Sequence, residues 1–152
     1  MPSELDDLYR DVILDHYRSP RGAAPLAHPT VTQDGYNPLC GDEVKLELLV
    51  ENGRIADVSV QGRGCSISVA SGSLLAEQLK GKTVAEARQV LEAFRALLHG
   101  DGAPDEDALG DLMALEGVKS FPVRIKCALL PWTTLEQALA VDGAAGGRPD
   151  AR

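Results

Sequence analysis

The sequence predicts an α+β fold, in which a small antiparallel β-sheet of about three strands packs against helices on one side. Two observations favour this class. Residues 43–60 alternate apolar and polar side chains on both sides of an Asn52-Gly53 pair, which is typical of a β-hairpin turn that needs positive φ at both positions. The segments before and after this hairpin instead repeat their apolar residues at helical spacing.

The first helix is predicted to begin after Ser3, whose side chain can cap it, and to end at the turn formed by residues 19–22. Its apolar face consists of Leu5, Leu8, Tyr9, Val12, Ile13 and Tyr17. The stretch that follows, up to Gly35, is predicted to be a loop with a short strand around Val31.

Two helices are predicted after the hairpin. Gly62-Arg63-Gly64 ends the return strand, and a helix rich in small residues covers 66–79. The next helix begins after Thr83, which forms a capping box with Glu86.

The rest of the chain is predicted to hold an acidic insertion, a helix and a tail. Residues 99–118 are acidic and look like an insertion with a short helix at 109–115. Pro122 suits the first position of a helix that carries Cys127, and Pro131 is expected to interrupt this helix. The predicted domain spans 1–141, and residues 142–152 are predicted to be disordered.

Length and charge narrow the function classes. The chain has 152 residues, which suits a single domain. Fifteen Lys and Arg against 23 Asp and Glu give a net charge of −8, which disfavours nucleic acid as a partner. The sequence contains no apolar run of membrane-spanning length, so no membrane partner is expected. The beginning of the chain is acidic and does not resemble a signal peptide, and a cytoplasmic location is therefore expected.

Three cysteines lie at predicted element ends. Cys40 precedes the hairpin and Cys65 follows it, so strand pairing should bring the two to the same end of the sheet. Cys127 would be delivered by the last helix. An odd number of cysteines in a domain of this size does not favour a set of disulfides. Each cysteine is therefore expected to be a small buried side chain, a reactive thiol or a metal ligand.

Asp42 adds an oxygen donor two residues after Cys40. Three thiolates and one carboxylate form a four-coordinate set that suits zinc or an iron–sulfur centre. Neighbouring cations favour the thiolate form, and they are Arg63, Arg124 and Lys126. The three histidines lack ligand spacing to a cysteine and rank below Asp42 as a fourth ligand; they are His16, His28 and His99.

Four segments resemble the IscU/NifU-type iron–sulfur assembly proteins, in the order that this family shows. They are Tyr9–Gly22, Asn37–Asp42, Gly62–Ser73 and Arg124–Ala128. Within that family the chain is most similar to the SufU branch. Lys126 stands where scaffold members carry a histidine before the third cysteine, and residues 99–118 match the extra segment of SufU-type proteins.

The resemblance implies a Zn²⁺ ion held by Cys40, Asp42, Cys65 and Cys127. It also implies sulfur acceptance from a pyridoxal-phosphate-dependent cysteine desulfurase of the SufS type, with the sulfur passed on to the downstream iron–sulfur assembly machinery. The first helix and the cysteine-bearing loops would then form the docking surface. The chain would be a sulfurtransferase-like partner rather than a stand-alone enzyme.

In the mechanism suggested by chemistry and resemblance together, Cys40 accepts the sulfur and Arg124 stabilises the freed thiolate. Two alternatives stay open at this point. One is a scaffold on which iron and sulfide assemble into a [2Fe–2S] cluster. The other is a structural zinc domain used for binding.

Overall fold

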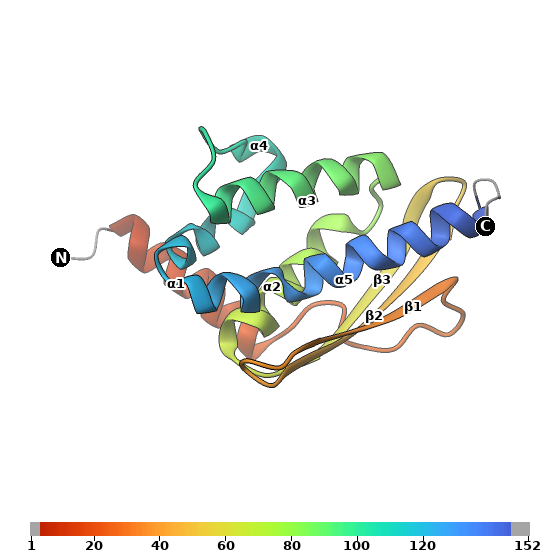
Figure 1. Ribbon diagram of the computed structural model, residues 1–152, viewed down its shortest axis with the longest axis horizontal. Helices are drawn as coiled ribbons and strands as arrows, with labels where there is room; N and C mark the ends of the chain where they lie inside the picture. The colour runs from red at the N-terminus through yellow and green to blue at the C-terminus, as the bar shows by residue number, and fades with distance from the viewer. Residues whose placement is uncertain (1–3, 147–152) are drawn as a thin grey trace.

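The computed structural model describes the backbone of residues 4–146 and the side-chain surroundings of residues 9–140. It shows an α+β fold built on one antiparallel sheet with strand order β1-β2-β3 (Figure 1). The elements are α1 (Glu4–Arg18), β1 (Val31–Asn37), β2 (Asp42–Glu51), β3 (Arg54–Arg63), α2 (Ser66–Leu79), α3 (Val84–His99), α4 (Glu106–Leu109), the 3₁₀ helix η1 (Gly110–Ser120) and α5 (Pro122–Gly146).

The predicted hairpin is confirmed as β2 and β3. Asn52 and Gly53 form its turn at φ values of 54° and 74°, which is the conformation that this pair favours. The predicted short strand around Val31 is confirmed as β1, which extends to Asn37 and pairs with β2. At one end of the sheet Asn37 lies opposite Asp42, and Glu43 lies opposite Arg63.

Helices cover one face of the sheet. Helix α5 packs on β1 and β2, and α2 packs on β3 (Figure 1). Helix α3 lies in a further layer and contacts α5 and η1. Phe94 of α3 and Trp132 of α5 are both fully buried, with ring centroids 5.2 Å apart. No helix among residues 4–146 combines the length and the apolar character needed to cross a membrane.

The predicted starts of α2 and α3 are confirmed. Helix α2 covers 66–79. Thr83 caps α3 by accepting a hydrogen bond from the Glu86 amide at 3.0 Å, and the Glu86 carboxylate accepts one from the Thr83 amide at 2.9 Å. The predicted cap of α1, Ser3, lies outside the described residues, and α1 runs from Glu4 to Arg18.

The prediction that Pro131 interrupts the last helix is wrong, because α5 is one continuous helix with Pro131 inside it. A proline at position 131 removes the backbone hydrogen bond to the Cys127 carbonyl. The helix continues past this gap, and buried hydroxyls bind two nearby carbonyls. Ser71 donates to the Ala128 carbonyl at 2.6 Å, and Thr134 donates to the Leu130 carbonyl at 2.8 Å. The helix also includes residues 142–146 of the predicted tail, whose remainder, 147–152, lies outside the described residues.

The acidic segment at 99–118 is anchored in the core. It forms α4 and η1, and η1 replaces the predicted short helix at 109–115 with a longer 3₁₀ helix. Its aspartates and Glu106 are exposed and Glu116 is half-buried, whereas Leu109, Leu112 and Leu115 are fully buried. These leucines tie the segment to the other helices, and η1 packs against α1 and α3.

Candidate metal centre

The fold brings the four predicted metal ligands to one end of the sheet. Cys40 lies exposed in the β1–β2 turn, and Asp42 begins β2 with its side chain fully buried. Cys65 follows β3 as the N-cap residue of α2. Cys127 lies in the second turn of α5 and is fully buried. Figure 1 shows that the β1–β2 turn and the start of α2 share this end of the sheet.

The donor atoms lie within reach of a common centre. The Sγ atoms of Cys40 and Cys127 are 3.0 Å apart. One ligand atom from each of Cys40, Asp42 and Cys127 lies within 4.8 Å of the other two, so these three can hold a metal ion. Cys65, the fourth predicted ligand, lies outside this group of mutually close donors, although its Sγ is 3.7 Å from Asp42 Oδ2.

Backbone geometry holds Asp42 in place. Its Oδ1 accepts a hydrogen bond from the Cys65 amide at 2.9 Å, which ties the start of β2 to the start of α2. Gly64 adopts φ 143°, and a Cβ atom there would overlap the Asp42 carboxylate. Glycine is therefore required here, both for its backbone angle and for the close approach.

Asn37 orders the turn that carries Cys40. Its backbone carbonyl accepts hydrogen bonds from the amides of Cys40 at 3.3 Å and Gly41 at 2.8 Å. Its side-chain Oδ1 accepts one from the Leu39 amide at 3.1 Å, and its Nδ2 lies 4.0 Å from Cys127 Sγ. Sequence reasoning gave Asn37 no role, although an Asn-Pro pair before a cysteine is a turn signal.

The surroundings of Cys127 disfavour its charged form. Burial raises the pKa of the Cys127 thiol, and its hydrogen bonds with Cys40 and Asp42 raise this pKa further. The negative charge of Cys65 acts in the same direction. A divalent cation among these donors would offset the repulsion, and three sulfurs with one carboxylate form a donor set that fits zinc.

Arg124 lies beside two of the sulfurs. The Cys65 thiolate raises the pKa of the Arg124 guanidinium most, and Cys127 adds to the effect, which places the cation next to both sulfurs. The other cations named from the sequence, Arg63 and Lys126, are exposed.

The histidines stay apart from the cysteines. His16 is buried on α1 and bonds Ser73, and His99 Nδ1 contacts the Arg95 carbonyl at 2.8 Å. His28 is exposed in the loop before β1. Within the described part of the chain, the group of donors around Cys40 contains no histidine.

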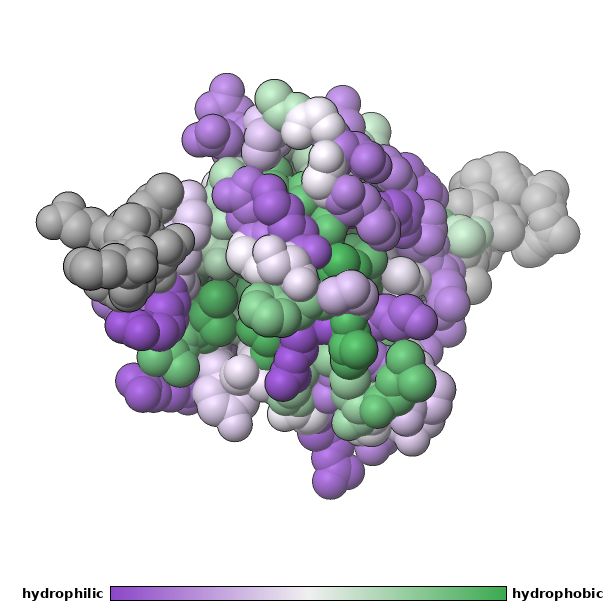
Figure 2. All heavy atoms as spheres, turned by 60° about the vertical axis from the view of Figure 1, so that its left-hand side comes forward, coloured by the Kyte–Doolittle hydropathy of each residue, from purple (hydrophilic) through white to green (hydrophobic). Residues whose placement is uncertain are grey.

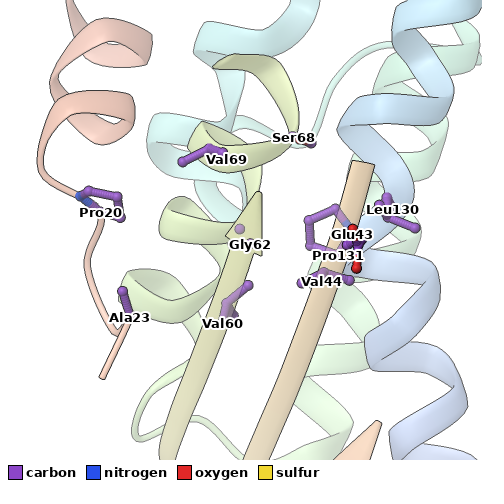
Figure 3. A pocket seen from close by; sticks show the side chains of 11 residues that line it. Pro20, Ala23, Glu43, Val44, Val60, Gly62, Ser68, Val69, Leu130 and Pro131 are labelled. Carbon is purple, nitrogen blue, oxygen red and sulfur yellow. The ribbon is translucent and has the colours of Figure 1, made fainter. Parts of the chain in front are cut away.

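The space around the centre suits a protein partner better than an enclosed small substrate. A cavity behind it, lined by Glu43, Val60 and Pro131 among others (Figure 3), has a volume of about 40 Å³ and holds a few water molecules at most. Large apolar side chains are exposed nearby: Tyr36, Leu39, Phe121 and Val123. Figure 2, which brings this end of the molecule forward, shows apolar side chains exposed among hydrophilic ones.

Comparison with known proteins yields relatives along nearly the whole chain. The zinc-dependent sulfurtransferase SufU of Bacillus subtilis is 41% identical over 138 residues, covering 91% of this chain and 93% of the relative. The iron–sulfur cluster assembly scaffold protein IscU of Thermotoga maritima is 37% identical over 132 residues, covering 87% of this chain and 92% of the relative.

Solved structures and a family model agree with these relatives. The crystal structure of an iron–sulfur cluster assembly scaffold protein for the SUF system from Fervidobacterium islandicum superposes with a TM-score of 0.81 at 37% identity, covering 85% of this chain and 94% of that chain. The model described as the NifU-like N terminal domain matches residues 8–128. The chain therefore belongs to the NifU-like N-terminal domain family and is an iron–sulfur cluster assembly protein of the IscU/SufU type.

Proposed function

We propose that this protein is a zinc-dependent sulfur-transfer protein, which accepts persulfide sulfur from a cysteine desulfurase and passes it on for iron–sulfur cluster assembly. The observation that carries the proposal is the exposure of a single thiol, Cys40, from a donor group whose other members are more buried. The relative from Bacillus subtilis, whose name states a zinc-dependent sulfurtransferase, supports the same activity.

Four residues would hold the zinc: Cys40, Asp42, Cys65 and Cys127. When bound, the ion keeps the thiols deprotonated without adding redox chemistry. Asp42, Cys65 and Cys127 sit on β2, α2 and α5, which makes them the fixed part of the set. Cys40 sits in a turn beside Gly41, whose φ of 73° and open surroundings leave this segment the freest to move.

Cys40 would act as the sulfur acceptor. Its thiolate attacks the terminal sulfur of the persulfide on the desulfurase, a sulfur–sulfur bond forms at Cys40, and the bond to the donor cysteine breaks. The donor sulfur leaves as a thiolate and takes up the persulfide proton, so no external oxidant or reductant is needed. Arg124 would favour this step by stabilising negative charge at the sulfur group, where its guanidinium lies next to Cys65 and Cys127.

The partner would be a pyridoxal-phosphate-dependent cysteine desulfurase of the SufS type. Two open grooves flank the cysteines. One is lined by Tyr36, Leu39 and Lys126, among others, and the second by Phe121 and Arg124 with residues of α1 and η1. Grooves with apolar walls and cations at their rims suit a protein that brings its own reactive sulfur on an extended loop.

The decisive experiment follows labelled sulfur from cysteine through the desulfurase to this chain. Protein with one zinc per chain should take up sulfane sulfur at Cys40 and raise desulfurase turnover. Cys40→Ala should abolish uptake. Arg124→Gln should slow uptake severalfold, whereas Lys126→Gln, which removes a neighbouring cation, should have a much smaller effect. Full uptake by the Cys40→Ala protein would refute the proposal.

A second candidate function is a scaffold for [2Fe–2S] assembly, which the IscU relative from Thermotoga maritima favours. Protein purified without added metal distinguishes the two. Zinc in the isolated chain supports transfer, and a coloured iron–sulfide centre supports scaffolding. A purely structural zinc site predicts unfolding on chelation but no effect on desulfurase turnover.

A further inference from the structure

A second cluster of metal-ligand residues lies where α1, α2 and η1 meet. It consists of His16 from α1, Glu77 from α2 and Asp111 from η1. One donor atom from each lies within 4.8 Å of the other two. The cluster shares no residue with the cysteine centre, and the proposed sulfur transfer makes no use of it.

His16 is built into this cluster with a fixed orientation. The residue is 3% exposed, and its Nδ1 lies 2.6 Å from Ser73 Oγ. The same Ser73 oxygen accepts a hydrogen bond from the Arg21 amide at 2.8 Å, so the hydroxyl is itself held in place. A histidine whose second ring nitrogen is bonded in this way is typical of metal sites, because that bond sets the direction of the first nitrogen.

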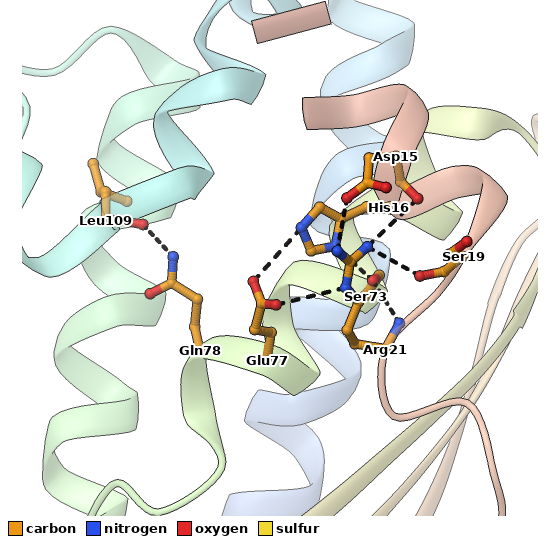
Figure 4. A network of polar contacts seen from close by, with 8 residues as sticks. All are labelled: Asp15, His16, Ser19, Arg21, Ser73, Glu77, Gln78 and Leu109. Carbon is orange, nitrogen blue, oxygen red and sulfur yellow. Dashed lines mark hydrogen bonds and ion pairs between the residues drawn. The ribbon is translucent and has the colours of Figure 1, made fainter. Parts of the chain in front are cut away.

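The other ring nitrogen of His16 points toward the Glu77 carboxylate (Figure 4). Nε2 lies 3.6 Å from Glu77 Oε1, which is longer than a hydrogen bond. Within the described part of the chain, Nε2 makes no shorter polar contact. In the tautomer whose ring proton is on Nδ1 and directed at Ser73, Nε2 presents a lone pair to the cluster.

The charges around the cluster leave room for a dication. Arg21 pairs with Asp15 at 2.7 Å, which balances one carboxylate, and it reaches Glu77 Oε2 only at 3.6 Å. Arg21 is thus shared between Asp15 and Glu77, and together with Asp111 three carboxylates face this one guanidinium, in a chain of net charge −8.

We propose that His16, Glu77 and Asp111 form a divalent-cation site for a first-row ion of the Mn²⁺ or Fe²⁺ class. One imidazole nitrogen and two carboxylate oxygens suit these ions, whereas the cysteine centre offers sulfur. The Glu77 side chain is 43% exposed, so water can reach the ion and complete its coordination. The bound ion would join the three elements that carry its ligands.

Manganese provides the test, because free Mn²⁺ has a characteristic electron paramagnetic resonance signal. Full-length protein with zinc in its cysteine centre is titrated with Mn²⁺, and the free ion is measured. We expect one Mn²⁺ per chain. Glu77→Gln and Asp111→Asn should each weaken binding about tenfold or more. Glu116→Gln is the matched control, because this η1 carboxylate pairs with Lys119 at 3.3 Å and should leave the affinity unchanged.

Nuclear magnetic resonance of the histidine rings locates the ion. The chain has three histidines, and bound Mn²⁺ should broaden the signals of His16 while those of His28 and His99 stay sharp. Equal broadening of all three, equal binding by the Glu77→Gln protein, or no Mn²⁺ beyond the zinc would each overturn the site. These measurements use no desulfurase, so their failure would leave the sulfur-transfer proposal as it stands.

Discussion

At Gly64 a single missing side chain makes room for Asp42, a proposed metal ligand. The backbone of this residue passes so close to Asp42 that a Cβ atom would overlap the carboxylate. Two positions earlier, Gly62 faces only the Glu43 carbonyl, at 3.6 Å from the Cβ position. The two glycines bracket Arg63 on the same strand end, but only one of them shapes the metal centre.

Gly64→Ala should weaken zinc binding about tenfold or more, because Asp42 must move to accommodate the methyl group and the φ of 143° becomes strained. Competition with a chromophoric chelator measures the affinity. Gly62→Ala adds the same methyl group on the same strand and should bind zinc like the original chain. Equal affinities for the two variants would show that Asp42 is not held by this contact.

His16 should titrate below its ordinary pKa of 6.5, because burial and the nearby Arg21 charge disfavour the imidazolium, while Glu77, Asp15 and Asp111 oppose them less strongly. The unfolded chain then binds a proton more readily than the folded one. The contribution of His16 to the free energy of unfolding is therefore complete above pH 6.5 and falls as pH falls toward the lower folded-state pKa. Ring-proton titration of metal-free protein checks this, and a pKa at or above 6.5 would contradict it.

Among the elements, those with local signals were predictable and those that depend on distant contacts were not. Asn52-Gly53 sets the hairpin and Thr83 with Glu86 sets the start of α3, because each signal acts within four residues. The run of α5 through Pro131 is accompanied by contacts to another helix, such as the hydrogen bond from Ser71 to the Ala128 carbonyl. No local pattern in the last helix could reveal that partner.

The same distinction applies to the site. The hairpin predicts that Cys40 and Cys65 converge, because pairing places them at one end of the ladder. The arrival of Cys127 depends on how closely α5 packs on β1. A side chain at Gly35 would overlap Thr134 Oγ1. The absence of a side chain at this position in β1 therefore determines how closely α5 can approach the sheet. Nothing in the sequence around Gly35 or Thr134 indicates that the two meet.

Thr83→Ala should destabilise the protein by about 1 kcal/mol, because the first turn of α3 loses the hydroxyl that accepts the Glu86 amide. Urea denaturation measures the change. Thr32→Ala is the control, since it makes the same substitution at an exposed strand position. The hydrogen bonds with Thr83 also lower the pKa of Glu86, so this part of the cap weakens as pH falls below the ordinary value of 4.5. Equal unfolding free energies for the original and Thr83→Ala proteins would contradict the role of the cap.

At the scale of the whole molecule, the cysteine centre joins regions that are far apart in the chain. Its donors come from the β1–β2 turn, the start of β2, the start of α2 and the second turn of α5. Two of them, Asp42 and Cys127, are fully buried. A metal bound there would hold the sheet, α2 and α5 together. Its removal would leave the thiols and the Asp42 carboxylate close together without a cation to offset their negative charge.

Chelation should therefore lower the melting temperature, and restored zinc should raise it again. Zinc at about one hundred times its dissociation constant would add about 2.7 kcal/mol to the free energy of unfolding. Scanning calorimetry with and without chelator measures the shift. The Cys127→Ser protein should show a much smaller response to zinc. An unchanged melting temperature of the original chain would mean that the ion does not bind the folded state more tightly than the unfolded one.

The position of Cys127 near the end of the chain has a consequence for biosynthesis. Ribosomes make proteins from the N-terminus at about 5–20 residues per second. Cys40, Asp42 and Cys65 are therefore synthesised before the helix that carries Cys127. A nascent chain that stops before residue 127 has two sulfurs and a carboxylate but no closing ligand. The proposed donor set thus cannot be completed until residue 127 has been made and α5 can pack on the sheet, which restricts metal insertion to chains that include this helix.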